Sequence, residues 1–433
     1  MPSVPTSVEV RAYQVGFGDC FLVSFVYARG TKRHVLVDFG TTELPRGVVA
    51  SRHMPQVAQA IRDECGGALT AVVATHRHAD HISGFATDAR SGRAGEIIAA
   101  CKPKLVLQPW TEDPEAAADA TRATARSSRS PRSFLKGLAA MHHIAAAALR
   151  VAQTPPRSMS LATVKQLRFL GMDNVKNPSA VDNLIRMGKA GRAVWARHGS
   201  NAGLARLLPG VKVRVLGPPD LTQTEAIKKM RSSDPDEFWQ LVGGPKALPE
   251  LGGVDVPARP SGKRRIPLPA EARWFGERLS VMSNEQLLEI VRTLDDQMNN
   301  TSLILLFEVG NKKLLFPGDA QIENWSYALR DAPDAAATRK LLAGVDFYKV
   351  GHHGSRNATP RQLLWEGFAR RGAPKDTRLR TMLSTLPGKH GTAAKHTEVP
   401  RETLLTALEA ETVLLNTNDL PKGALCQLTV VDV

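Results

Sequence analysis

Short apolar runs, separated by turns that contain Gly and Asp, predict β-strands at both ends of the chain. Near the start, residues 8–15 and 21–27 form a predicted hairpin, and residues 34–40 form a third strand. Two later runs, which begin at Lys313 and Phe347, end in a carboxylate and in paired histidines. The other predicted strands cover residues 69–74, 104–108, 211–216, 299–307, 381–384, 412–415 and 427–431, and the last two are expected to complete a second sheet.

The middle of the chain has a different pattern. Because 433 residues exceed one typical hydrophobic core, we expect either one large domain with an insertion or two domains. Predicted helices cover residues 53–65, a segment from Ile82 onward, and residues 134–153, 222–230 and 284–297, and a Pro- and Gly-rich linker covers 243–269.

One polar motif stands directly after a buried strand. The apolar run 69–74 leads into Thr75-His-Arg-His-Ala-Asp-His81, which holds four potential metal ligands within six residues. If the turn is tight, His76 and His78 can face one ion while Asp80 and His81 turn toward a second. Two such ions can share a water and lower its pKa from about 15.7 to roughly 7. The motif therefore predicts a metal site, against the alternatives of a His-rich surface loop or of an Asp that caps the helix expected from Ile82 onward.

This motif resembles the signature of the metallo-β-lactamase-fold hydrolases, Thr-His-x-His-x-Asp-His. The order strand, Gly-x-Gly-Asp19, strand, turn, strand, Asp38-x-Gly resembles one branch of that superfamily, the hydrolase domain of the DNA-uptake protein ComEC and its soluble relatives. The resemblance extends over roughly residues 8–110 and 299–433. It therefore implies a core domain formed by residues 1–110 and 299–433. Residues 111–298 would be a basic, helical and loop-rich insertion, in which residues 211–219 return to the core sheet. The implied fold is α/β, a four-layer αββα sandwich of two facing mixed sheets with helices outside, which carries the largely helical basic insertion.

The resemblance also implies roles for individual residues. Asp319 would bridge two ions, and His352 or His353 would complete the shell of the second ion; both fit the spacing, with His352 the first able to turn inward. Asp38 and Asp19 would support the ligands from behind. His396 would contact phosphate or act as general acid, with a packing histidine as the alternative. The implied metal ligands are His76, His78, Asp80, His81, Asp319, His352 or His353, and Asn300, and Asp80 also counts as catalytic.

One position departs from the common family pattern. Asn300, or its neighbour Asn299, stands where many family members have a histidine ligand. ComEC-like sequences resemble this chain in having an asparagine at that position. An amide oxygen is a weaker ligand for Zn²⁺ than imidazole and suits a harder ion such as Mn²⁺. His198 is the alternative candidate for this ligand. The expected cofactors are two divalent ions, Zn²⁺ or Mn²⁺.

Charge adds a candidate partner. The chain has 57 Lys and Arg against 42 Asp and Glu, a net charge of +15 and a pI near 9.9. Residues 120–172 contain no acidic residue but nine basic ones. Such a segment suits a phosphate backbone, and solvated surface is the alternative. Candidate nucleic-acid contacts are Arg122, Arg126, Arg129 and Arg132.

The expected function is that of a metal-dependent hydrolase, a phosphodiesterase or nuclease that attacks DNA or RNA through a metal-bound hydroxide. One alternative is a hydrolase of a small substrate, such as a lactone, a β-lactam or a cyclic nucleotide. The other is a non-catalytic nucleic-acid-binding or regulatory module with a degenerate metal site. No apolar run reaches 18 residues and no signal peptide is evident, so we expect a cytoplasmic protein without a membrane partner.

Overall fold

The computed structural model describes residues 4–114, 177–224, 298–391 and 397–433, together with isolated positions between these ranges. Its strands form two mixed sheets. The first sheet has seven strands in the order β13-β1-β2-β3-β4-β5-β6. These strands are β1 (Ser7–Tyr13), β2 (Cys20–Val26), β3 (Lys32–Phe39), β4 (Ala71–Val73), β5 (Val106–Pro109), β6 (Ala193–Ala196) and β13 (Cys426–Asp432).

The second sheet has six strands in the order β12-β11-β10-β9-β8-β7. β8 pairs antiparallel with both β7 and β9, and β9 to β12 run parallel. In the first sheet, β3 to β6 are likewise parallel. The strands of the second sheet are β7 (Val211–Gly217), β8 (Ile304–Val309), β9 (Lys312–Phe316), β10 (Phe347–Lys349), β11 (Arg380–Leu383) and β12 (Val413–Asn416).

A single apolar cluster joins the two sheets. Alternate residues of β1, β2 and β3 pack against alternate residues of β8 and β9, as expected when each sheet turns one side of its pleat inward. Phe25 of β2 contacts Phe307 of β8 with ring centroids 5.6 Å apart, and Phe21 contacts Phe316 at 6.2 Å. Removal of this apolar surface from water holds the sheets together.

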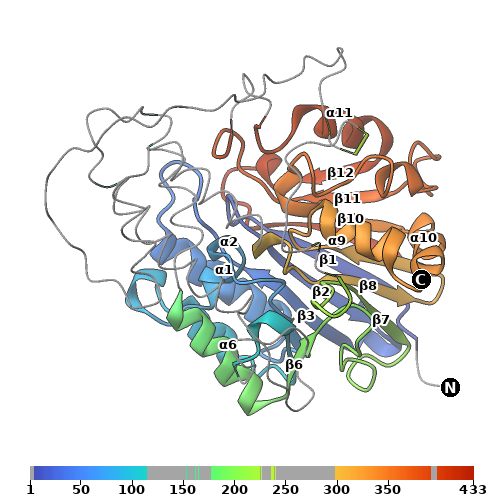
Figure 1. Cartoon of the computed structure of the whole chain (residues 1–433). Coiled ribbons are helices and arrows are strands. Elements are labelled where there is room, and N and C mark those ends of the chain that lie inside the picture. Colours follow the sequence, from blue (N-terminus) through green and yellow to red (C-terminus); the bar gives the residue numbers. More distant parts are fainter. Residues whose placement is uncertain are drawn as a thin grey trace, which may run out of the picture.

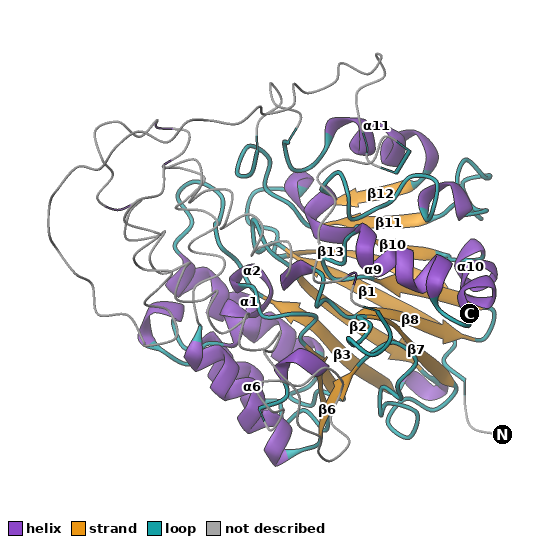
Figure 2. Ribbon diagram, viewed as in Figure 1, coloured by secondary structure: helices purple, strands orange, loops and turns teal. Residues whose placement is uncertain are grey.

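Helices cover the opposite side of each sheet (Figures 1 and 2). The first sheet packs against α1 (Ala50–Glu64), α3 (Ala94–Ala100) and α6 (Pro178–Ala190). The second packs against α9 (Ile322–Ser326), α10 (Ala335–Ala343) and α11 (Glu402–Glu411). α2 (Ala79–Ile82) is a single turn beside β3. Among the helices that the structure describes, none has both the length and the apolar character needed to cross a bilayer.

One feature of the fold differs from the sequence-based expectation. The last strand, β13, was expected in the second sheet, but it pairs antiparallel with β1 in the first, with Ser7 opposite Asp432. Periodicity identifies a strand but not its partner, which explains this error. α6 and β6 fall within residues 111–298. Leu184 of α6 lies in the apolar cluster on the helix-covered side of the first sheet, and Ala196 of β6 lies in the cluster between the two sheets. The predicted helices over 134–153 and 284–297 lie outside the described residues.

Candidate metal centre

The polar residues of the predicted site follow strands that end at one edge of the two sheets. Asp38 lies near the end of β3, and the Thr75–His81 loop follows β4. Asp319 follows β9, and His353 follows β10 of the second sheet. Parallel strands place their carboxyl ends at the same edge, so residues far apart in the sequence meet there.

Close backbone packing holds the Thr75–His81 loop, called the metal loop below, in place. The amide of Asp19 donates a hydrogen bond to the carbonyl oxygen of Asp80, at 2.9 Å. A Cβ atom on Gly40 would lie 2.5 Å from the backbone nitrogen of His81, and one on Gly18 would lie 2.3 Å from the carbonyl oxygen of Gly40. Because no side chain fits between these backbones, both positions require glycine.

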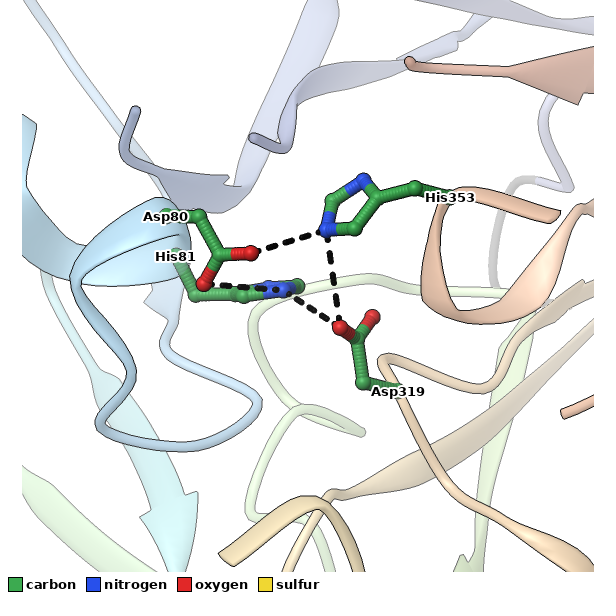
Figure 3. Close-up of side chains that lie close together, drawn as sticks. All are labelled: Asp80, His81, Asp319 and His353. Atoms are coloured by element: carbon green, nitrogen blue, oxygen red, sulfur yellow. Dashed lines mark hydrogen bonds and ion pairs between the residues drawn. The ribbon is translucent and has the colours of Figure 1, made fainter. Parts of the chain in front are cut away.

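Four buried side chains converge between the two sheets: Asp80, His81, Asp319 and His353 (Figure 3). Nε2 of His81 lies 3.0 Å from Oδ2 of Asp319. Nε2 of His353 lies 2.9 Å from Oδ2 of Asp80 and 3.5 Å from Oδ2 of Asp319. One ligand atom from each of the four lies within 4.8 Å of the others. This buried group could hold a metal ion.

A second group adjoins the first. His76, His78 and Asp80 each offer a ligand atom within 4.8 Å of the other two. Nε2 of His76 lies 2.9 Å from Nδ1 of His78, within hydrogen-bond distance. Burial, together with the neighbouring His81 and His78, holds the pKa of His76 well below its ordinary value. A neutral imidazole is the form that binds metals.

Fixed acceptors orient the histidines of the first group. Nδ1 of His81 lies 2.8 Å from Oδ2 of Asp38, whose oxygens also accept hydrogen bonds from the amide and hydroxyl of Thr75, both at 2.7 Å. Nδ1 of His353 lies 3.0 Å from the carbonyl oxygen of Ser384. Since a carbonyl or carboxylate can only accept, each Nδ1 donates, and each Nε2 faces Asp80 and Asp319. Metal-binding histidines are held in this way.

The electrostatics of the group fit a cation. Burial lowers the pKa of His81, but Asp319, Asp80 and Asp38 outweigh burial and raise that pKa well above its ordinary value. Burial raises the pKa of Asp319, but His81 and His353 outweigh it, and the pKa falls well below its ordinary value. In this arrangement a proton on Nε2 of His81 lies between the imidazole and the carboxylates and offsets their negative charge. A divalent cation replaces this proton with its own positive charge, so the donor set suits a metal ion.

The paired histidines take different positions. His352 (φ 43°) and His353 (φ 50°) both have left-handed backbone conformations, which are uncommon outside glycine. His353 is buried and belongs to the ligand group. The side chain of His352 is 17% exposed, and its Nε2 lies 3.8 Å from Oδ2 of Asp319. Its Nδ1 has no hydrogen-bond partner among the described residues. The geometry thus favours His353 over His352 as the ligand.

The two asparagines come shortly before Ser302 and Leu303, which contact the candidate site. The amide of Leu303 donates to the carbonyl oxygen of Thr75 at 2.9 Å, and Oγ of Ser302 accepts from the amide of Asp319 at 3.3 Å. Asn300 donates to Oε2 of Glu323 at 3.2 Å. Within the described part of the chain, Oδ1 of Asn300 and both polar atoms of the Asn299 side chain have no hydrogen-bond partner, although both residues are fully buried.

Other sequence-predicted residues lie elsewhere. His198 is held by the carbonyl oxygen of Leu216 at 2.9 Å and by Asp334 at 3.0 Å. It lines a separate open cavity of about 590 Å³ and belongs to none of the groups above. His396 and the four arginines Arg122, Arg126, Arg129 and Arg132 lie outside the described residues.

Sequence reasoning missed Lys349. Its side chain is only 3% exposed and is paired with Asp19 and Asp319. Burial lowers the pKa of Lys349, but the two carboxylates outweigh burial and raise it above its ordinary value. A signal was present, since a lysine within the apolar run Phe347–Val350 needs a buried counter-charge.

No protein-family model matches this chain, and a search of curated proteins also finds no match. What the structure establishes is a mixed α/β protein with two mixed sheets and a buried His/Asp group that could hold a metal ion.

Proposed function

We propose that this chain is a metallo-β-lactamase-fold hydrolase, a four-layer αββα sandwich that uses two divalent ions to cleave phosphodiester bonds in nucleic acid. The observation that carries the proposal is the position of Asp80, which belongs to both ligand groups. A carboxylate shared between two adjoining groups suits a pair of ions. Two-metal sites of this kind are common in enzymes that cleave phosphodiesters.

Buried charge supports two ions rather than one. Asp19, Asp38, Asp80 and Asp319 are buried, and Lys349 is the buried ammonium beside them. With neutral histidines, three negative charges remain uncompensated. One divalent ion leaves the site negative, whereas two leave it with a single positive charge. The second case favours an anionic substrate such as a phosphodiester.

Two sets of residues would hold the ions. His76 and His78 with Asp80 form one set, and Asp80, His81, Asp319 and His353 form the other. When bound, such ions activate a water and neutralise charge that develops on the phosphoryl oxygens. The buried amide oxygens of Asn299 and Asn300 supply candidate oxygen ligands without other partners among the described residues. Oxygen donors favour Mn²⁺ over Zn²⁺ at the first set.

The protein side chains prepare the site for this chemistry. Asp38 and the Ser384 carbonyl hold the Nδ1 atoms of His81 and His353, so that both rings present Nε2 without rearrangement. Burial excludes water and strengthens each electrostatic interaction within the group. His352, whose side chain is 17% exposed, would contact a substrate phosphate rather than bind an ion.

Nucleic acid is the proposed substrate because of the net charge of +15. Such a field attracts polyanions and raises their association rate. The acid-free segment 120–172 is the proposed contact for the phosphate backbone.

The test begins with metal-stripped protein. After addition of Mn²⁺ or Zn²⁺, it is assayed on plasmid, single-stranded DNA, RNA and bis-p-nitrophenyl phosphate, with a lactone and a β-lactam as small substrates. We expect phosphodiester hydrolysis, higher with Mn²⁺, that Asp319→Asn abolishes and the surface variant Asp63→Asn leaves intact. Hydrolysis of the lactone or β-lactam alone would replace the nuclease with a small-substrate enzyme. No hydrolysis despite metal binding would reduce the protein to a binding module.

A second test concerns the acid-free segment. Alanine at Arg122, Arg126, Arg129 and Arg132 should weaken DNA binding and reduce its salt dependence. The slope of log K against log salt falls by about 0.9 per lost contact on duplex DNA and 0.7 on single strands. Hydrolysis of bis-p-nitrophenyl phosphate should hardly change, because this substrate is too short to reach the segment. The control replaces four exposed basic residues with alanine: Arg29, Lys102, Lys104 and Lys189. Equal losses in both variants would show that the segment is ordinary solvated surface.

A further inference from the structure

A buried ammonium group lies directly behind the ligand group. Lys349 is the last residue of β10, and its side chain is 3% exposed. Nζ donates a hydrogen bond to the carbonyl oxygen of Gly318 at 3.1 Å. It also forms ion pairs with Oδ2 of Asp19 and, at 3.5 Å, with Oδ1 of Asp319. The ammonium thus has an acceptor for each of its three hydrogens.

The two oxygens of Asp319 therefore have different surroundings. Oδ1 faces the ammonium of Lys349. Oδ2 faces the ligand side, 3.0 Å from Nε2 of His81 and 3.5 Å from Nε2 of His353. The backbone amide of Asp319, bonded to Oγ of Ser302, fixes the residue between these two sides.

We propose that Lys349 is a positioning residue that occupies Oδ1 of Asp319 and so restricts this carboxylate to a single metal-ligand oxygen, Oδ2. This inference rests on the proposed metal-dependent function. An unrestrained carboxylate can bind one cation through both oxygens. With Oδ1 held by the ammonium, Asp319 would offer one oxygen to an ion held with Asp80, His81 and His353, and would leave that ion a coordination position for substrate.

Asp19 makes this arrangement possible. A buried lysine paired only with Asp319 would withdraw negative charge from the ligand group. The carboxylate of Asp19 supplies the balancing charge, and it is itself buried behind both histidines, with Oδ1 3.5 Å from Nδ1 of His353. The Asp19–Lys349 pair is neutral as a unit, so it can set the geometry of Asp319 without changing the total charge that draws cations into the site.

Three variants separate the role of Lys349 from a purely structural one. Lys349→Met removes the charge, and Lys349→Arg keeps it. Asp19→Asn combined with Lys349→Met removes the ion pair as a whole, which avoids leaving Asp19 buried and unpaired. The readouts are Co²⁺ and Mn²⁺ affinity by equilibrium dialysis, the visible absorption spectrum of bound Co²⁺, and hydrolysis of bis-p-nitrophenyl phosphate.

Release of Oδ1 should add a ligand oxygen to the bound ion. Because Co²⁺ absorbs visible light less intensely as its coordination number rises, we expect weaker absorption in Lys349→Met and in the double variant. We expect Co²⁺ affinity within about threefold of wild type in the double variant, and hydrolysis at least tenfold lower. Lys349→Arg should retain the wild-type spectrum.

An unchanged Co²⁺ spectrum in the folded double variant would overturn the inference. Unfolding of the double variant would also overturn it, since the pair would then determine the fold and not the ligand geometry. These outcomes are distinct from failure of the proposed function. Wild-type protein that binds Co²⁺ but hydrolyses no phosphodiester would refute that function and leave the spectral test of Lys349 intact. Wild-type protein that binds no divalent ion would refute both.

Discussion

Nε2 of His353 lies 2.9 Å from Oδ2 of Asp80, although 273 residues separate the two in the chain. Asp80 belongs to the loop after β4 of the first sheet, and His353 follows β10 of the second. The candidate metal centre is therefore formed jointly by both sheets. Its integrity depends on the apolar contacts between them, as well as on the ligands.

The shared ligand Asp80 provides the most direct test. Asp80→Asn keeps the size of the side chain but removes its charge, so both ligand groups lose a carboxylate. We expect metal binding to fall by more than one ion equivalent and hydrolysis to fall to background. Elemental analysis after dialysis against Mn²⁺ measures the first, and bis-p-nitrophenyl phosphate the second. His81→Ala should have the same effect, and near-normal turnover by either variant would contradict the two-ion proposal.

The paired histidines allow a contrast within one dipeptide. His353→Gln removes a buried ligand, whereas His352→Gln changes a partly exposed ring outside the ligand group. We expect His353→Gln to weaken binding of Co²⁺ or Mn²⁺ by more than about tenfold. His352→Gln should leave metal affinity within about twofold and lower the turnover. The reverse pattern in titration calorimetry would make His352 the ligand.

Asp38 contacts Thr75 and His81, and through His81 it adjoins the group of Asp80, Asp319 and His353. Asp38→Asn still accepts one hydrogen bond from Thr75, but its amide no longer fixes Nδ1 of His81 as a donor. Changes to such supporting groups typically lower metal affinity about 10- to 100-fold. We expect a loss in this range, measured by competition with a chelator. Asp63→Asn, on the surface of α1, is the control, and equal affinities in the two variants would show that Asp38 does not support a ligand.

Backbone packing around Gly40 gives a prediction that depends on steric fit and involves no change of charge or of a ligand. In Gly40→Ala the new methyl group would lie 2.5 Å from the backbone nitrogen of His81, so the metal loop must move. We expect a lower unfolding temperature together with a loss of metal affinity. Gly367→Ala is the matched control, since a Cβ atom there has no neighbour within 4 Å. If Gly40→Ala bound metal like the control, the close approach would not position the loop.

His34 predicts a pH dependence that is unrelated to the metal. Burial lowers its pKa to about 4, and its Nδ1 lies 2.8 Å from Oγ of Ser24. The unfolded chain, with a histidine pKa of about 6.5, binds a proton that the folded chain excludes. The stability contributed by neutral His34 is therefore complete above pH 6.5 and is lost as the pH falls toward 4. One proton accounts for a slope of at most about 1.4 kcal/mol per pH unit.

Urea unfolding of His34→Gln at pH 7 and pH 4.5 measures this contribution. The variant should lose less stability between the two values than wild type does. His53→Gln, which replaces a half-buried histidine on α1, is the control and should follow wild type. If His34→Gln kept the wild-type slope, other groups would be responsible for the pH dependence.

The sequence allowed most strands to be predicted, because alternating or continuous apolar runs bounded by Gly, Asp and Pro are a local signal. β6 was missed, since Ala193–Ala196 is too short and too mixed to stand out. The partner of β13 could not be predicted, because pairing depends on which strand edge is available in space.

The candidate site shows the same contrast between local signals, which the sequence reveals, and spatial relationships, which it does not. The cluster from His76 to His81 is contiguous and was recognisable from the sequence. The difference between His352 and His353 was not, because left-handed backbone conformations decide which ring turns inward. Lys349 was overlooked because its two carboxylate partners, Asp19 and Asp319, are distant in the sequence.

The division of the ligands between the two sheets also has a consequence for protein synthesis. Ribosomes add about 5–20 residues per second, so the 273 residues from Asp80 to His353 take about 14–55 s to appear. Throughout that interval the nascent chain carries the His76–His81 ligands without Asp319 or His353. The group of His76, His78 and Asp80 is translated as one short segment, whereas the group of Asp80, His81, Asp319 and His353 still lacks two members. This second group can therefore form only after residue 353 has been translated and the second sheet has docked.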